Sequence, residues 1–315
     1  MPENTQSEKI YIGADVSKAT IDLFNDETGE HQTIKNDKAA IRRFLKTIKT
    51  QTVIVFEATG GYERKLSDLI ETMPMLERLR VHPSCVKSFA RALGTKAKTD
   101  KIDAYMLAKA ARTMKDSFVD TTPPKHVQAL RDRLTYQRQL EAMLHAEECR
   151  LKMKDLPTDI LSELKKHVSY LKSRIAYIKA GTKVMIREYP ELLSKYDRLK
   201  DVKGIGAVIA TTVLAYLPEL GRLGRKEVAA LAGLAPHTRQ SGTKTSRAFT
   251  TGGRKELRRV LYIGALVGSQ HNPVLKAFYE KLCKAGRPKM VALIATARKL
   301  LIHINANEKK FLNNA

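Results

Sequence analysis

The apolar residues near the start of the chain alternate with other residues, and the spacing then changes to that of a helix. Alternation through residues 10–16 and again through residues 21–23 predicts a β-hairpin, and a third short strand is expected near Ile34. Asp37 is then placed to cap a helix whose apolar residues fall on one face. The pattern therefore predicts three consecutive strands followed by a helix.

Strands and helices continue to alternate through the first third of the chain. Residues 52–56 form a β-branched and aromatic run that predicts a buried strand, and a helix is expected from Tyr62 after a glycine turn. A further strand is expected at residues 79–81, and a last helix at residues 100–114. Three strands followed by this alternation resemble an α/β RNase H-like domain, which we expect over residues 9–118.

The middle of the chain, residues 124–192, is charged and poor in glycine. Its second half places apolar residues at alternating steps of three and four, the spacing of a coiled-coil seam. The seam consists of Leu161, Leu164, Val168, Leu171, Ile175 and Ile178. A similar stripe begins at Val127, and residues 155–159 break the two helices. We therefore expect an antiparallel coiled-coil hairpin, packed on itself or on another copy, before a mostly α-helical domain over residues 198–312.

The composition adds a strong positive charge to this picture. The 315 residues include 57 Lys and Arg against 33 Asp and Glu, a net charge of +24, so we expect a polyanionic partner, with nucleic acid as the leading candidate. The longest nearly apolar run, residues 207–217, is too short to span a membrane. The polar first residues lack the apolar core of a secretion signal, and the three cysteines form no Cys-x-x-Cys pair. We therefore expect a cytoplasmic protein with neither a disulfide framework nor a zinc site.

Four carboxylates occupy positions that a metal site would require. Asp15 lies at the end of the first strand, and Glu57 lies at the carboxyl end of the buried strand. Asp100 and Asp103 share one face of the first turn of a helix that Thr99 can cap. The helix dipole alone also favours acidic residues at such a position. The order of all four favours a site for Mg²⁺ or Mn²⁺, which prefer oxygen ligands and can position a scissile phosphate.

A glycine-containing turn in the last third is a candidate for contact with nucleic acid. Gly204-Ile205-Gly206 between two helices is typical of a helix-hairpin-helix, in which glycines let the backbone approach a phosphate. Lys203 adds a positive charge beside it. Glycine also serves any tight turn between helices, so the signal is weak by itself.

A basic loop follows at residues 236–260. Its cations are Arg239, Lys244, Arg247, Arg254, Lys255, Arg258 and Arg259. A solvated basic surface is one interpretation of this loop, and a phosphate-binding loop is the other. A serine here could attack phosphorus once its proton is removed, but the residues alone do not distinguish Ser241 from Thr243, Thr245 or Ser246.

Together these motifs resemble the insertion-sequence family one-hundred-and-ten, the DEDD transposases related to the Piv DNA invertases. The matching stretches are residues 12–18, 56–62, 98–104, 204–206, and 232–236 leading to Ser241-Gly242. They span nearly the whole chain in the family's order. The resemblance implies a RuvC-like domain, a coiled-coil connector and a C-terminal transposase domain with a helix-hairpin-helix.

The resemblance also implies roles for particular residues. Asp15, Glu57, Asp100 and Asp103 would be the DEDD metal ligands, and Ser241 would be the nucleophile that forms a covalent phosphoserine with DNA. A structured bridge RNA would pair with donor and target DNA. The enzyme would work as a homo-oligomer, a dimer or tetramer, in which different protomers share active sites.

Two other functions remain open from the sequence. One is a RuvC-like metal nuclease or resolvase that uses water as the nucleophile and forms no covalent intermediate. The other is a non-catalytic protein that binds RNA or DNA, although the complete set of carboxylates argues against it.

Overall fold

The chain divides into two compact units, Met1–Thr122 and Pro123–Ala315. The computed structural model describes residues 9–58, 60–94, 99–114, 118, 120–237, 240–241, 244–245 and 249–314, and only the backbone at residues 237, 240, 241, 244 and 245. No helix in this described part is long and apolar enough to cross a membrane.

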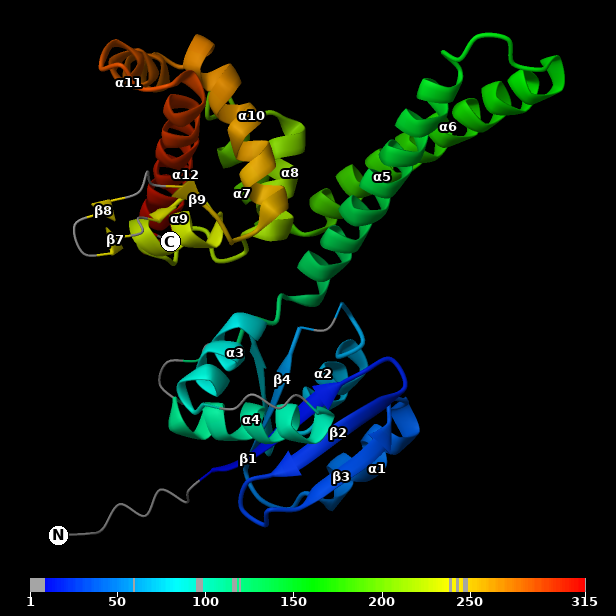
Figure 1. The fold of residues 1–315 in the computed structure, drawn as a ribbon, viewed down its shortest axis with the longest axis vertical. Coiled ribbons are helices and arrows are strands. Elements are labelled where there is room, and N and C mark those ends of the chain that lie inside the picture. Colours follow the sequence, from blue (N-terminus) through cyan, green and yellow to red (C-terminus); the bar gives the residue numbers. More distant parts are fainter. Residues whose placement is uncertain are drawn as a thin grey trace. The chain divides into compact units, whose positions relative to one another are not determined.

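The first unit is a five-stranded sheet with helices on both faces (Figure 1). Its elements are β1 (Ile10–Val16), β2 (Thr20–Asn25), β3 (His31–Lys35), α1 (Lys38–Thr47), β4 (Thr52–Glu57), α2 (Arg64–Ile70), β5 (Leu76–Val81), α3 (Pro83–Ala92) and α4 (Asp100–Thr113). The strand order is β3-β2-β1-β4-β5, and β1 runs antiparallel to β2 but parallel to β4. This mixed sheet is compatible with an RNase H-like fold.

Alternation along the strands decides which helices cover each face of the sheet. Ile12, Ala14 and Val16 of β1 belong to one buried cluster with apolar residues of α1 and α2. Tyr11, one residue out of phase, belongs to the opposite cluster with residues of α3 and α4. The predicted cap of α1 is confirmed, because the Asp37 side chain accepts a hydrogen bond from the Ala40 N–H at 2.8 Å.

Two helices of this unit differ from the sequence-based expectation. α2 begins at Arg64 rather than at Tyr62, because Gly60 and Gly61 adopt positive φ angles of 70° and 107° and hold the chain in a turn. α3 was not expected at all. Its start has an ordinary signal, since Pro83 occupies the first turn and His82 accepts a hydrogen bond from the N–H two residues on.

The second unit is mainly helical. Its elements are α5 (Lys125–Arg150), α6 (Thr158–Glu188), α7 (Pro190–Lys200), α8 (Ala207–Tyr216), α9 (Arg225–Leu231), β6 (Pro236–His237), β7 (Gln240–Ser241), β8 (Lys244–Thr245), β9 (Phe249–Thr250), α10 (Lys255–His271), α11 (Pro273–Lys284) and α12 (Lys289–Asn314). The base of the long hairpin, including Val127 and Leu130, joins the same buried cluster as α8, α10 and α12.

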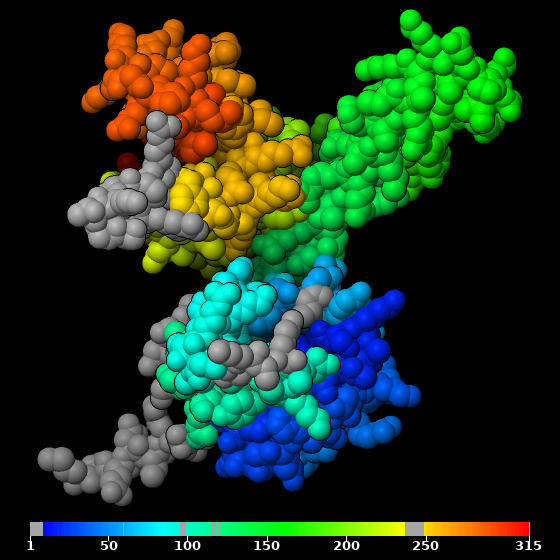
Figure 2. Space-filling model, viewed as in Figure 1, coloured from blue at the N-terminus to red at the C-terminus, as the bar shows by residue number. Residues whose placement is uncertain are grey.

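α5 and α6 form a long helical hairpin (Figures 1 and 2). Leu171, Ile175 and Ile178 of the expected seam are buried against Leu140 of α5. The chain reverses between Leu151 and Pro157, where Asp155 adopts a positive φ of 61°. The apolar stripe therefore packs the two helices together.

Candidate active site

Two of the expected carboxylates follow from the pairing of β1 with β4. The parallel register aligns Ala14 with Phe56, so Asp15 and Glu57 are the next residues along the two neighbouring strands. Paired residues of parallel strands face the same side of a sheet, and here that side is the one covered by α3 and α4. Both carboxylates are half-buried at the carboxyl edge of the sheet.

Helix α4 brings the other two carboxylates to the same edge. Its last turn lies at the opposite end of β1, because Arg112 pairs with Asp26 at 3.0 Å and the Asp26 N–H donates to the Tyr11 carbonyl. α4 therefore runs antiparallel to β1, and its first turn, with Asp100 and Asp103, lies toward the end where β1 finishes. The Thr99 hydroxyl accepts a hydrogen bond from the Ile102 N–H at 3.3 Å and fixes this helix start.

Gly13 determines how closely α4 lies on the sheet. A Cβ atom at this position would come within 1.9 Å of the Ala104 carbonyl oxygen and 2.7 Å of the Ala108 amide nitrogen. Phe24, opposite Gly13 on β2, packs edge-on against Tyr105 of the same helix. Only glycine permits this contact, and the contact places the first turn of α4 beside the strand that carries Asp15.

Asp15 and Glu57 share one edge of the sheet, and the helix turn that carries Asp100 and Asp103 begins toward the same edge. Among the described residues, no group of three or more His, Cys, Asp and Glu side chains lies close enough to hold a metal ion. Their oxygen donors nonetheless suit a hard divalent cation, and like charges gathered at one edge are stabilised when a cation lies between them.

A fifth carboxylate lies beside this set and was missed by the sequence analysis. Asp22 pairs directly with Asp15 across β1 and β2, and its Oδ1 accepts a hydrogen bond from the Thr33 hydroxyl at 2.5 Å. The alternation of β2 could have revealed it, since Asp22 and Phe24 fall on the same face of that strand.

Ser241 lies in a short hairpin of the second unit. Its backbone pairs with Lys244 across β7 and β8, while Pro236 of β6 pairs with Thr250 of β9. The side chains of Ser241 and Lys244, and the whole of Arg239 and Arg247, lie outside the described residues.

The base of this hairpin is fixed by backbone contacts. Gly233 and Gly253 both have positive φ, and a Cβ atom on Gly253 would come within 2.2 Å of the Gly233 nitrogen. The Arg254 N–H donates to the Leu231 carbonyl at 2.7 Å, and the Arg258 guanidinium donates to the Gly252 carbonyl at 2.6 Å. The segment that carries Ser241 therefore leaves from a closely packed base.

The structure gives Arg254 a partner within the protein. Its guanidinium donates to both carboxylate oxygens of Glu219, at 2.7 and 2.6 Å, and to the Tyr216 carbonyl at 2.7 Å. Burial alone would raise the pKa of Glu219, but the hydrogen bonds and positive charge of Arg254 outweigh burial and lower the pKa below its usual value. A phosphate contact by Arg254 would have to compete with this pair, whereas Lys255 is exposed at the first residue of α10.

The two glycines of the expected helix-hairpin-helix differ in their surroundings. Gly204 has a φ of 107°, and a Cβ atom there would lie 3.0 Å from the Gly264 carbonyl oxygen of α10. Gly206 has open space around it and precedes the first turn of α8. Lys203 is exposed, and its carbonyl accepts a hydrogen bond from the Asn272 side chain at 3.1 Å. Packing thus accounts for the first glycine, and the second leaves the start of α8 accessible.

Comparison with known proteins identifies the class. Residues 12–154 match the DEDD transposase model of the IS110 family, and residues 196–280 match the model described as "Transposase IS116/IS110/IS902 family". The chain is therefore a DNA transposase, an enzyme of DNA recombination. It belongs to the IS110 family of transposases.

Two curated relatives extend over almost the full chain. The pilin gene-inverting protein of Moraxella lacunata is 26% identical over 309 residues, which cover 93% of this chain and 94% of that protein. The pilin gene-inverting protein of Moraxella bovis shows the same identity and coverage. A DEDD transposase domain also suggests that the enzyme requires a divalent metal.

Proposed function

We propose that this transposase cleaves and rejoins DNA through a covalent phosphoserine at Ser241, with Asp15, Glu57, Asp100 and Asp103 as the metal-binding set. The observation that carries the proposal is that Asp15 and Glu57 end two neighbouring parallel strands, while the first turn of α4, which carries Asp100 and Asp103, lies toward the end at which β1 finishes. A catalytic metal site needs such convergence of residues from separate elements.

The proposed chemistry conserves the energy of the cleaved phosphodiester bond in a phosphoserine ester. The Ser241 hydroxyl loses its proton and attacks phosphorus, an ester bond forms between its Oγ and the phosphate, and the bond to a deoxyribose oxygen breaks as that oxygen takes up a proton. A deoxyribose hydroxyl of another DNA end then attacks the ester and releases the serine. A Mg²⁺ or Mn²⁺ ion held by the carboxylates would neutralise charge on the phosphate.

The closely packed base of the hairpin and the basic residues that follow it support Ser241 as the attacking group. Lys255, Arg258 and Arg259 lie at the start of α10, directly after β9. Positive groups near a pentacoordinate phosphorus stabilise the negative charge that develops during attack. Lys203 and Gly206 at the start of α8 would contribute further contacts to the nucleic-acid backbone.

A bridge RNA and a homo-oligomer complete the proposal. The net charge of +24 suits a protein that holds RNA together with donor and target DNA. Exposed apolar residues recur every seven residues on the outside of the hairpin, at Tyr170, Tyr177 and Val184, which are 59%, 65% and 53% exposed. Such a second stripe suits coiled-coil packing between protomers.

The test of this function is a stalled reaction on a suicide DNA substrate. The wild-type protein should become joined to DNA by a bond that survives denaturation, and Ser241→Ala should abolish the adduct and strand exchange while keeping affinity for RNA and DNA. Cleavage by Ser241→Ala without any adduct would instead establish the water-dependent nuclease. Failure of cleavage and adduct with every RNA supplied would favour a binding protein.

A further inference from the structure

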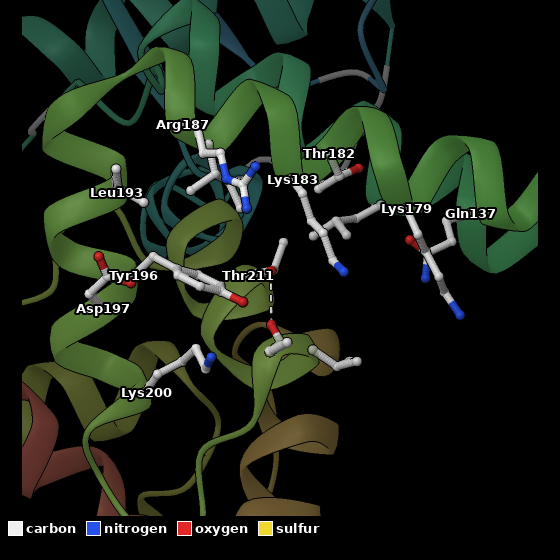
Figure 3. Close-up of a pocket in the computed structure, with 14 residues that line it drawn as sticks. Gln137, Lys179, Thr182, Lys183, Arg187, Leu193, Tyr196, Asp197, Lys200 and Thr211 are labelled. Atoms are coloured by element: carbon white, nitrogen blue, oxygen red, sulfur yellow. Dashed lines mark hydrogen bonds between the residues drawn. The ribbon is translucent and has the colours of Figure 1, made fainter.

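A cleft of about 500 Å³ opens among α5, α6, α7 and α8 in the second unit, and none of its lining residues belongs to the Ser241 hairpin (Figure 3). Its rim carries Lys183 and Arg187 of α6 and Lys200 of α7. All three are exposed, and among the described residues no carboxylate pairs with any of them. A fourth rim cation, Lys179, already pairs with Glu141 at 3.2 Å.

The lining of the cleft is partly apolar and includes one aromatic ring. Leu193 and Val208 line it, and the half-buried Tyr196 projects from α7 toward the side on which Arg187 and Lys183 extend (Figure 3). Val208 is 65% exposed although it is β-branched and apolar. The Lys200 ammonium lies 5.7 Å from the centre of the Tyr196 ring, so positive charge and an aromatic face adjoin here, which suits a ligand with an anionic side and a flat apolar side.

We propose that this cleft binds a single-stranded segment of RNA, with phosphates at Lys183, Arg187 and Lys200 and a base against Tyr196. Lys183 and Arg187 are one helical turn apart, roughly 6 Å along the axis, so they form a row that can follow a chain of phosphates rather than a single anion. Aromatic side chains beside such a row are the usual platform for an unpaired base.

One residue of the cleft selects RNA over DNA in this proposal. Asp197 lines the cleft and is exposed among the cations. Its carboxylate would repel a phosphate, but it can accept a hydrogen bond from a ribose 2′-hydroxyl, as acidic residues do in dinucleotide sites. Deoxyribose offers no such donor, so Asp197 should favour RNA.

The first test measures salt dependence with the full-length protein and a short fluorescent oligouridylate. Lys183→Gln with Arg187→Gln should weaken binding and reduce the slope of log affinity against log salt by about 1.4, since each lost single-strand phosphate contact removes about 0.7. Lys165→Gln with Lys309→Gln removes the same charge from exposed residues outside the cleft and should leave affinity nearly unchanged.

A second variant separates the cleft from the general surface charge. Tyr196→Leu removes the aromatic ring without changing any charge, and it should lower affinity about tenfold while leaving the salt slope unchanged, because base stacking is lost but phosphate contacts remain. Equal affinity of this variant and the wild type would overturn the proposal.

A third measurement compares the oligouridylate with an oligodeoxyuridylate of the same length. The wild type should prefer RNA, and Asp197→Ala should lose this preference by weakening RNA binding without weakening DNA binding. Equal wild-type affinity for the two probes would refute the assignment of Asp197 and the choice of RNA.

The inference rests on the proposed function in taking RNA as the partner, and its failure can be distinguished from failure of that function. RNA binding by the wild type that none of the cleft variants alters would overturn the cleft alone. A wild type that binds no RNA would overturn both the cleft and RNA guidance, while the adduct at Ser241 would still be tested by the suicide substrate.

Discussion

Gly13→Ala is the substitution that most directly probes how the fold builds the carboxylate edge. The new Cβ atom would lie 1.9 Å from the carbonyl oxygen of Ala104 and 2.7 Å from the amide nitrogen of Ala108. Both are backbone atoms of α4, so no side chain can rotate away and the helix itself must move. Overpacking of this kind costs roughly 1–3 kcal/mol, and contact with backbone places it at the upper end.

Hydrogen exchange measured by mass spectrometry reports this cost for the first unit separately from the second. A loss of about 3 kcal/mol should reduce the protection of amides in β1 and α4 about a hundredfold. The carboxylates of α4 would shift relative to Asp15, so metal-dependent cleavage should fall as well.

Gly181→Ala is the matched control. It lies inside α6, where the added Cβ atom would approach only the far end of the Arg133 side chain at 2.8 Å, and alanine favours a helix by about 1 kcal/mol over glycine. The control should keep or raise stability and activity. Unchanged protection of α4 and full cleavage by Gly13→Ala would refute the close packing of α4 on β1 as the basis of the site.

Three further substitutions test separate parts of the account. Asp15→Ala should abolish Mg²⁺-dependent strand cleavage but keep nucleic-acid affinity in gel-shift assays, because the basic surface remains; full cleavage would contradict the metal site. Tyr170→Glu with Tyr177→Glu should lower the mass measured by light scattering without melting the hairpin, and an unchanged mass would exclude this surface as the interface. Arg254→Gln should destabilise the second unit by about 1–3 kcal/mol at neutral pH, because Glu219 stays charged without its partner. Because the pKa of Glu219 is lowered in the folded protein, the stability advantage of the wild type is present above the usual carboxyl pKa and is lost as pH falls through the folded-state pKa. Equal stability of the two proteins at neutral pH would refute a stabilising role of the Arg254–Glu219 ion pair.

The elements that carry the carboxylates could be predicted from local patterns. Alternation defined β1, the β-branched run at residues 52–56 marked β4, and Thr99 marked the start of α4. Each of these signals lies within a few residues of the element that it predicts. The edge at which they meet follows from parallel pairing of neighbouring strands.

Contacts between distant segments were beyond the reach of those patterns. Glu219 lies 35 residues before Arg254, so the basic loop gave no sign that this cation already has a partner. Gly204 was expected to let the backbone approach a phosphate, but its close contact with Gly264 depends on how α10 packs against the turn. The cleft that Lys183 lines likewise depends on the packing of four helices, α5 to α8, which no single stretch of sequence encodes.

The central claim is that Ser241 becomes covalently joined to DNA, and the most direct test is to identify the linked residue. The stalled complex is digested with nuclease and protease, and the peptide that retains a nucleotide is sequenced by mass spectrometry. The account predicts a single modified peptide with the nucleotide on Ser241, absent when Ser241→Ala is used. A nucleotide on Thr243, Thr245 or Ser246 would contradict the assignment of the nucleophile, and cleaved DNA with no modified peptide would contradict the covalent mechanism.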